Sequence, residues 1–198
     1  MPYARKDTLT WELGRYYHIY NRGARRVTIF REATNFLFVT SQMKKYSKVN
    51  KTSVIAYCLM PNHYHFLLRQ DGEKPAGGLA QSVFNSYSKA YNKKYSHSGT
   101  LFEGRFLAQV IQKNSHLINL CIYIHVNPVK DGLVASPEDW PYSNYLEWIG
   151  ERDGTLFDLE FVRENFGSPA DYKALVMDYL KTRYIPEDVR KYLQSLEK

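Results

Sequence analysis

The sequence contains little of what marks a secreted or a membrane-embedded protein. Only two of its 198 residues are cysteine, Cys58 and Cys121, and each lies inside an apolar run. Two cysteines are too few for a disulfide framework or a zinc site, so we expect two buried thiols in a reducing compartment. No stretch approaches the roughly 20 apolar residues of a membrane helix, and residues 1–18 lack the apolar core of a secretion signal. We therefore expect a cytoplasmic protein with no membrane partner.

Acidic residues are scarce in the first two thirds of the chain. Residues 1–50 carry ten lysines and arginines against three acidic residues, and residues 51–135 carry nine against four. Residues 136–198 reverse this balance, with eight basic against thirteen acidic residues. A basic body favours a polyanionic partner such as nucleic acid, because neutralised phosphates release condensed counterions. A merely solvated basic surface explains the charge equally well.

The change of charge coincides with a turn-rich stretch that divides the chain into a body and a tail. We expect one domain over residues 1–148 and a small helical extension over residues 149–198. The extension shows helical spacing in three pieces, and Pro169 and Pro186 fall where helices commonly start.

Apolar periodicity in the body predicts alternating strands and helices. Strands are expected at residues 16–21, 53–60, 63–70 and 106–112, and helices at 30–48, 78–95 and 114–127. Pro128 is expected to end the last helix, because the residue before a proline is pushed out of the α conformation. The order β-α-β-β-α-β-α indicates an α+β fold, a ferredoxin-like antiparallel sheet with one additional helix.

Two histidines begin the third expected strand. Strand side chains alternate between faces, so His63 and His65 point the same way, about 7 Å apart at ~3.3 Å per residue. Two neutral imidazoles on one face can share a divalent metal ion. An isolated pair of this kind is more often an ordinary feature of a half-buried strand, so the pair alone decides nothing.

The expected helix at residues 114–127 carries a narrow polar stripe. The stripe consists of His116, Asn119, Tyr123 and Asn127, at spacings of three, four and four residues, while the other faces are apolar. Such a stripe faces either solvent or a site. Tyr123 could supply a nucleophilic oxygen, and Asn127 could supply an oxygen ligand one turn later. Most of the 17 tyrosines must nevertheless be packing residues.

These segments together resemble a known family. MPNHYHFLL (60–68) is similar to the His-hydrophobic-His strand of the HUH endonuclease superfamily. YIHVNPVKDGLV (123–134) and WPYSNY (140–145) look like the tyrosine-bearing helix and the following segment of REP-associated tyrosine transposases, relatives of the IS200 transposases. HIYNRGARRVTIF (18–30) and LFEGRF (101–106) also resemble that family. The resemblance spans about residues 15–148, and it implies the same ferredoxin-like fold that the periodicity predicts.

The resemblance implies a role for each matching residue. Tyr123 would be the single nucleophile, and His63 and His65 would bind a divalent metal ion, Mg²⁺ or Mn²⁺. Asn127 matches a position where IS200-like relatives place a glutamine ligand, although its side chain is one methylene shorter. His18 is a second candidate for the third ligand, because the first strand of a ferredoxin-like sheet lies beside the third.

The implied reaction is cleavage and rejoining of single-stranded DNA near a hairpin, through a covalent 5′-phosphotyrosine. Tyrosine has an ordinary pKa of about 10, so Tyr123 must lose its proton during attack. His116 on the same stripe is a candidate for this proton transfer. Candidate contacts to DNA phosphates are Arg22, Arg25, Arg26, Lys93, Lys94 and Arg105. A protein of this kind would be associated with the bacterial nucleoid when it is bound to DNA.

Three other functions stay open on the sequence alone. A catalytically silent, regulatory module would bind hairpin DNA with the same fold but without the chemistry. A plasmid relaxase or replication initiator would belong to the same superfamily, although the short chain and the single candidate tyrosine favour a transposase. A metal-dependent phosphodiesterase would use water in place of Tyr123. The sequence also leaves open whether the protein is a monomer or a homodimer.

Overall fold

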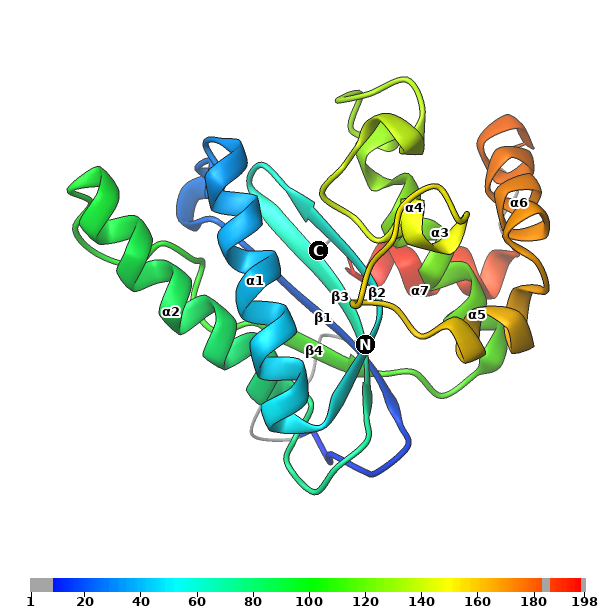
Figure 1. Ribbon diagram of the computed structural model, residues 1–198, viewed down its shortest axis with the longest axis horizontal. Helices are drawn as coiled ribbons and strands as arrows, with labels where there is room; N and C mark the ends of the chain where they lie inside the picture. Colours follow the sequence, from blue (N-terminus) through cyan, green and yellow to red (C-terminus); the bar gives the residue numbers. More distant parts are fainter. Residues whose placement is uncertain (1–8, 183–185, 197–198) are drawn as a thin grey trace.

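The computed structural model describes residues 9–182 and 186–196, which contain a four-stranded antiparallel sheet. Its strands are β1 (Tyr16–Arg22), β2 (Thr52–Met60), β3 (His63–Gln70) and β4 (Leu107–Val110), in the spatial order β2-β3-β1-β4. Helix α1 (Ala33–Asn50) joins β1 to β2, and α2 (Gly77–Tyr95) joins β3 to β4 (Figure 1). The predicted α+β, ferredoxin-like arrangement is confirmed, including the position of β1 beside β3.

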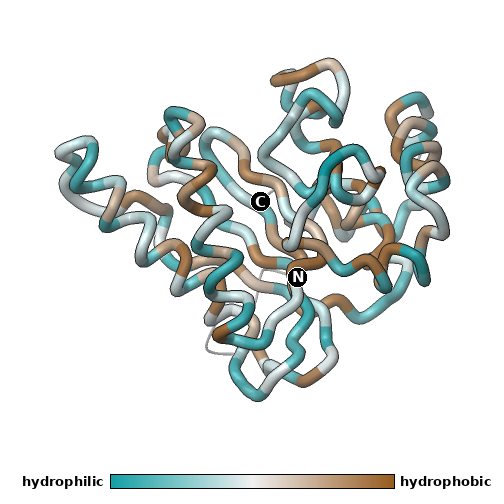
Figure 2. The backbone as a smooth tube through the Cα atoms, in the orientation of Figure 1, coloured by the Kyte–Doolittle hydropathy of each residue, from teal (hydrophilic) through white to brown (hydrophobic). Residues whose placement is uncertain are grey.

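The sheet separates two hydrophobic cores. Because strand side chains alternate, Tyr64 and Phe66 of β3 face α1 and α2, whereas Leu67 faces the opposite core. That second core is built on α3 (Asn114–Lys130), which packs across β2 and β3. Stretches of hydrophobic residues run along the strands of the sheet (Figure 2). The same alternation turns His63 and His65 towards α3.

Helix α3 does not end where the sequence predicted. Pro128 lies inside the helix, which continues to Lys130, so the expected end at residue 127 is wrong. Proline removes one intrahelical hydrogen bond, but the final turn still closes. Asp131 N donates to the carbonyl of Asn127 (2.9 Å), and Leu133 N donates to that of Pro128 (2.9 Å). A proline two residues from the helix end therefore costs little.

The described residues after α3 are largely helical and pack in the second core. Beyond α3 lie η3 (Pro137–Asp139), α4 (Tyr145–Trp148), α5 (Leu159–Phe166), α6 (Pro169–Thr182) and α7 (Glu187–Leu196). Helix α6 begins at Pro169, as predicted. Residues on both sides of the expected boundary after residue 148 share this core with α3. Parts of the expected tail, residues 183–185 and 197–198, lie outside the described residues, as do residues 1–8.

The state of the two cysteines and the character of the helices can be compared with what the sequence led us to expect. Cys58 and Cys121 are free and buried, as expected. Within the described ranges, no helix combines the length and the apolar character that crossing a membrane requires.

Candidate active site

A pocket of about 260 Å³ lies at the end of the sheet where β1 stops and β3 starts. Among the described residues its lining is Tyr20, Arg22, Arg26, Asn62, His63, His65, Tyr123, Asn127 and Asp131. Six of these nine were site residues predicted from the sequence. They come from β1, the turn after it, the start of β3 and the end of α3, so the fold gathers four separate segments of one chain around a single cavity.

His63 is held in one tautomer by its neighbour. Its Nδ1 lies 2.7 Å from the side-chain oxygen of Asn62. An amide oxygen only accepts, so His63 Nδ1 carries the proton and Nε2 keeps its lone pair. Burial, together with the nearby cations Arg22 and Lys130, lowers the pKa of His63 to about 4. The ring is therefore neutral near pH 7, which is the form that binds a metal ion.

His65 is held by a third histidine from β1. His18 Nε2 lies 3.0 Å from His65 Nδ1. Burial, together with nearby positive charge, places the pKa of His65 well below its ordinary value, and burial lowers the pKa of His18 to about 3. His18 is fully buried and does not line the pocket. The structure thus places His18 behind His65, and not beside a ligand held by the pair.

Tyr123 reaches the pocket from α3 and meets the histidines. Its ring stands perpendicular to that of His65, with the centroids 5.6 Å apart. The ammonium of Lys130 lies 4.2 Å from the centroid of the Tyr123 ring. One turn along, Asn127 Nδ2 donates to the carbonyl oxygen of Tyr123 (3.0 Å). Because the amide nitrogen is engaged within the helix, the amide oxygen is the atom of Asn127 that can serve a metal ion or a phosphate.

The N-terminal half of the polar stripe faces a different neighbour. His116 Nε2 lies 3.4 Å from a carboxylate oxygen of Asp188 on α7, and its ring stacks on Tyr192 with centroids 4.6 Å apart. His116 is not part of the pocket lining. Asn119 donates to the carbonyl of Ser115 (2.8 Å). The stripe is therefore divided between the pocket and the contact with α7, and the structure does not bring His116 to Tyr123.

A strained turn carries two of the predicted arginines. Arg25 (φ 55°) and Arg26 (φ 60°) both adopt the left-handed conformation within η2 (Ala24–Arg26), which costs roughly 1–2 kcal/mol for each non-glycine residue. Gly23 permits this turn, because a Cβ there would stand 2.3 Å from the carbonyl oxygen of Val27. The result is that Arg26 lines the pocket while Arg25 is exposed beside it. Such outliers concentrate at functional sites.

The other predicted cations lie outside or at the rim of the pocket. Arg22 lines it and forms an ion pair with Glu103. Lys94 forms an ion pair with Glu32, and Lys93 is exposed at the same end of α2. Arg105 is exposed in the segment before β4. The roles of these residues in binding DNA stay predictions.

Three residues of the lining were missed in the sequence. Asp131 follows Tyr123 and Asn127 at the same spacing of four residues, but the helix was expected to end before it. Tyr20 stands two positions before Arg22 and so shares its face of β1. Asn62 belongs to the turn that precedes His63. The four-residue spacing could have placed Asp131 on the same stripe as Tyr123 and Asn127. It was missed because the helix was expected to end at Pro128.

A buried polar network fixes α3 against the sheet. The side-chain oxygen of Asn144 accepts from Tyr57 N (2.8 Å) and lies 3.0 Å from His125 Nε2. His125 Nε2 must therefore carry the proton, and Nδ1 accepts from the hydroxyl of Tyr172 (2.6 Å). Burial lowers the pKa of His125 to about 4. These bonds join α3, β2 and α6, and on α3 they lie two residues from Tyr123.

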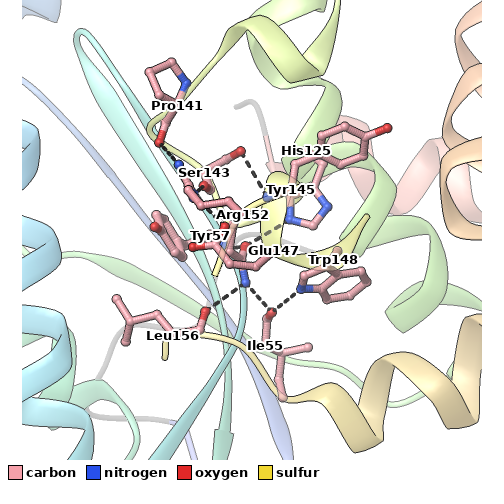
Figure 3. Close-up of polar contacts among 11 residues, drawn as sticks. Ile55, Tyr57, His125, Pro141, Ser143, Tyr145, Glu147, Trp148, Arg152 and Leu156 are labelled. Atoms are coloured by element: carbon pink, nitrogen blue, oxygen red, sulfur yellow. Dashed lines mark hydrogen bonds and ion pairs between the residues drawn. The ribbon is translucent and has the colours of Figure 1, made fainter. Parts of the chain in front are cut away.

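The segment around Asn144 also covers the free edge of β2. Leu59 N donates to the carbonyl of Tyr142 (2.9 Å). The indole of Trp148 donates to the carbonyl of Ile55 (3.2 Å), at the irregularity in the β2 register (Figure 3). The WPYSNY segment (residues 140–145) thus hydrogen-bonds both to β2 and to α3, and so helps to hold the helix of Tyr123 against the sheet.

The pocket offers a divalent metal ion a small number of protein ligands. The described residues contain no group of three or more histidines, cysteines or acidic residues able to hold a metal ion. They do offer two neutral imidazoles, His63 and His65, together with the amide oxygen of Asn127. The amide oxygen is a ligand type that Mg²⁺ and Mn²⁺ prefer, whereas imidazole is more typical of transition metals, so water or phosphate oxygens would have to complete the shell of either ion.

The sequence and the fold have counterparts among known proteins. The profile of the family described as "Transposase IS200 like" matches residues 13–127. A Haemophilus influenzae protein described as a REP-associated tyrosine transposase is 31% identical over 134 residues, which cover 60% of this chain and 69% of that protein. An Escherichia coli REP-associated tyrosine transposase is 22% identical over 131 residues, with 60% and 75% covered.

A solved structure shares the fold. It is that of a REP-associated tyrosine transposase bound to a REP hairpin, with a TM-score of 0.60 and 19% identity. The match covers 80% of this chain and 94% of that one.

Proposed function

Since this chain belongs to the IS200-like transposase family, we propose that its pocket cleaves and rejoins single-stranded DNA through a covalent bond to Tyr123. The observation that carries the proposal is the convergence of Tyr123, His63 and His65 on one cavity of a single chain. Taken alone, each of these residues also has an ordinary structural explanation. Together they supply a nucleophile and two neutral metal ligands at one place.

His63, His65 and Asn127 would hold the divalent ion. His63 presents Nε2 because Asn62 engages Nδ1. His65 presents Nε2 when its Nδ1 donates to His18, which makes His18 a supporting residue and not a ligand. A bound Mg²⁺ or Mn²⁺ supplies a Lewis acid that polarises the scissile phosphate.

Tyr123 would perform the covalent step. Its phenolic oxygen attacks phosphorus and forms the 5′-phosphotyrosyl bond, while the bond to the 3′-oxygen breaks. That oxygen leaves with the electron pair and takes up a proton from water to become a 3′-hydroxyl. Lys130 beside the ring favours the developing phenolate. Rejoining is the reverse: a 3′-hydroxyl attacks the phosphotyrosine, and the phenol is restored without any external energy source.

His116 does not fit the proton transfer, because it faces Asp188 and Tyr192 and not the cavity. Asp131 replaces it as the candidate acceptor of the Tyr123 proton, since it is the carboxylate of the described pocket lining. Arg22 and Arg26 would bind the phosphates on either side of the cleavage point. Hairpin DNA as the substrate is supported by the solved structure of the same fold, which contains a REP hairpin.

An adduct assay tests the proposal. The protein is incubated with Mn²⁺ and labelled single-stranded hairpin oligonucleotides from its own genomic flank, and the products are separated on a denaturing gel. We expect a covalent band that EDTA abolishes and that Tyr123→Phe removes. Tyr46→Phe is the matched control, because it deletes a hydroxyl that bonds Ser86 outside the pocket. Tight hairpin binding without any band would identify a silent binding module.

A further inference from the structure

A second cavity lies on the opposite face of the sheet, against α2. Its volume is about 450 Å³, within the range of ~300–1,000 Å³ typical of small-molecule sites. Among the described residues it is lined by Asn21, Tyr64, Ala80, Gln81, Phe84, Asn85, Ser88, Phe102, Gly104, Arg105 and Phe106. Of the roles given above, the phosphate contact expected of Arg105 is the one that belongs to this cavity, which part of the LFEGRF segment lines.

The cavity combines an aromatic floor with an amide rim. Tyr64 and Phe84 stack with their centroids 3.8 Å apart, and Phe102 meets the Phe84 ring edge-on at 5.1 Å. Above this floor, Gln81 and Asn85 lie one helical turn apart on the exposed side of α2. A floor of rings bordered by groups that both donate and accept hydrogen bonds matches a flat heterocycle with polar edges.

The charge of the lining favours a nucleotide over other planar ligands. Arg105 is the charged side chain of the described lining, and no carboxylate belongs to it. A guanidinium beside an aromatic floor is the combination that binds single-stranded nucleic acid, because the cation serves the backbone and the rings serve the base.

The two cavities share a wall at the end of β1. Strand register pairs Arg22 with His63 and Asn21 with Tyr64, so alternate residues of the same two strands face opposite cavities. Asn21 Nδ2 donates to the carbonyl of Gly104 (3.3 Å). The Arg22–Glu103 ion pair stands at the junction, joining the catalytic pocket to the loop of Phe102 and Arg105. A DNA strand crossing this junction therefore reaches both cavities.

We infer that the cavity between α2 and residues 101–106 receives an unpaired nucleobase of the DNA strand adjacent to the scissile phosphate. The inference rests on the proposed function for its substrate. The flipped base lies against the aromatic floor and is read at its edge by Asn85 and Gln81, while Arg105 holds the adjoining phosphate. The cavity thereby selects the nucleotide at the cleavage point, which neither the histidines nor Tyr123 can do.

An abasic scan tests this inference in the catalytically blocked Tyr123→Phe protein. Single abasic sites are placed along the strand flanking the hairpin, and the Kd of each oligonucleotide is measured. Loss of one stacked base weakens binding by roughly fivefold to a hundredfold, so we expect one or two adjacent positions with a penalty of about tenfold or more. Asn85→Leu should reduce that penalty to under about threefold, whereas Gln42→Leu, also an amide-to-leucine change but on α1 and outside the cavity lining, should leave it intact.

The outcomes separate the inference from the proposed function. A flat scan, or a penalty that Asn85→Leu leaves unchanged, overturns the base-binding cavity even if the Tyr123 adduct forms. A localised penalty that Asn85→Leu removes supports the cavity even if no adduct is found, and then only the cleavage chemistry is refuted. Absence of any DNA binding overturns both.

Discussion

His18 Nε2 lies 3.0 Å from His65 Nδ1, and their stacked rings have centroids 5.2 Å apart. Both rings are neutral near pH 7, because burial holds the pKa of each well below its ordinary value. One of the two nitrogens must therefore donate. If His65 is to turn a lone pair of Nε2 towards the pocket, its Nδ1 is the donor, and the proton of His18 sits on Nδ1. That atom is buried, with no partner in the described part of the chain.

The first prediction concerns the hydrogen bond by which His18 orients the ring of His65. His18→Phe keeps a buried ring but removes the acceptor for His65, and loss of such a partner typically weakens metal affinity about 10–100-fold. We expect a loss of that size in Mn²⁺ affinity, measured by titration calorimetry on protein whose folding is checked by circular dichroism. His18→Gln, which restores an acceptor oxygen, should recover part of it. Unchanged affinity in His18→Phe would show that His65 needs no orienting partner.

Asn127 gives a prediction about the third ligand. Asn127→Leu removes the amide oxygen from the pocket, and we expect the rate of adduct formation at limiting Mn²⁺ to fall about tenfold or more, in line with the cost of losing a metal-site partner. Asn127→Gln keeps the oxygen on a longer side chain and should retain activity within a few-fold. The measurement is the adduct rate over a range of Mn²⁺ concentrations. Equal Mn²⁺ dependence of Asn127→Leu and the unmodified protein would exclude Asn127 as a ligand.

Asn144 should be a stability residue, not a catalytic one. Asn144→Leu leaves the Tyr57 amide, the His125 ring and the Leu156 carbonyl without this partner, and each buried unpaired group costs about 1–3 kcal/mol. We expect the free energy of unfolding in urea to fall by several kcal/mol.

The matched control for Asn144 is Asn119→Leu on α3. Within the described residues the Asn119 side chain donates one hydrogen bond, to the Ser115 carbonyl at the helix surface, so this variant should lose under about 1 kcal/mol. A similar loss of unfolding free energy in both variants would contradict the stabilising role that we give to the segment around Asn144.

Stability should fall as the pH is lowered below about 6.5. Burial holds the pKa of His18 at about 3 and those of His63 and His125 at about 4, against an ordinary value of about 6.5. Between these values the unfolded chain binds more protons than the folded one, so the free energy of unfolding decreases with decreasing pH. We expect the Tm to drop steadily from pH 7 to pH 5, measured by differential scanning calorimetry.

Replacing one of these histidines should flatten the pH dependence. His63→Gln removes a titrating ring at the half-buried edge of the pocket, and the decline in Tm between pH 7 and pH 5 should then be shallower than in the unmodified protein. A decline of equal slope would mean that His63 is protonated equally in the folded and unfolded states.

Much of the fold and of the site could be predicted from the sequence, because local patterns carry them. The period-two pattern of β3 placed His63 and His65 on one face, and the four-residue spacing placed Tyr123 and Asn127 on one stripe of α3. The helix end was misjudged, because a proline near a C-terminus costs one hydrogen bond and packing of α3 on the sheet outweighs it. Because the helix was expected to end before residue 131, Asp131 was not recognised as a residue of the pocket.

The sequence by itself determined the order of the elements, the placing of His63 and His65 on one face and of Tyr123 and Asn127 on one stripe, and the resemblance of the chain to IS200-like transposases. Only the tertiary structure decided which partner each residue meets. Helix α7 covers His116, β3 brings His65 against His18, and the sheet end joins the catalytic pocket to the cavity of Asn85. The physical reason is that spacing along one element fixes the face a side chain occupies, whereas the contact on that face depends on elements distant in the sequence.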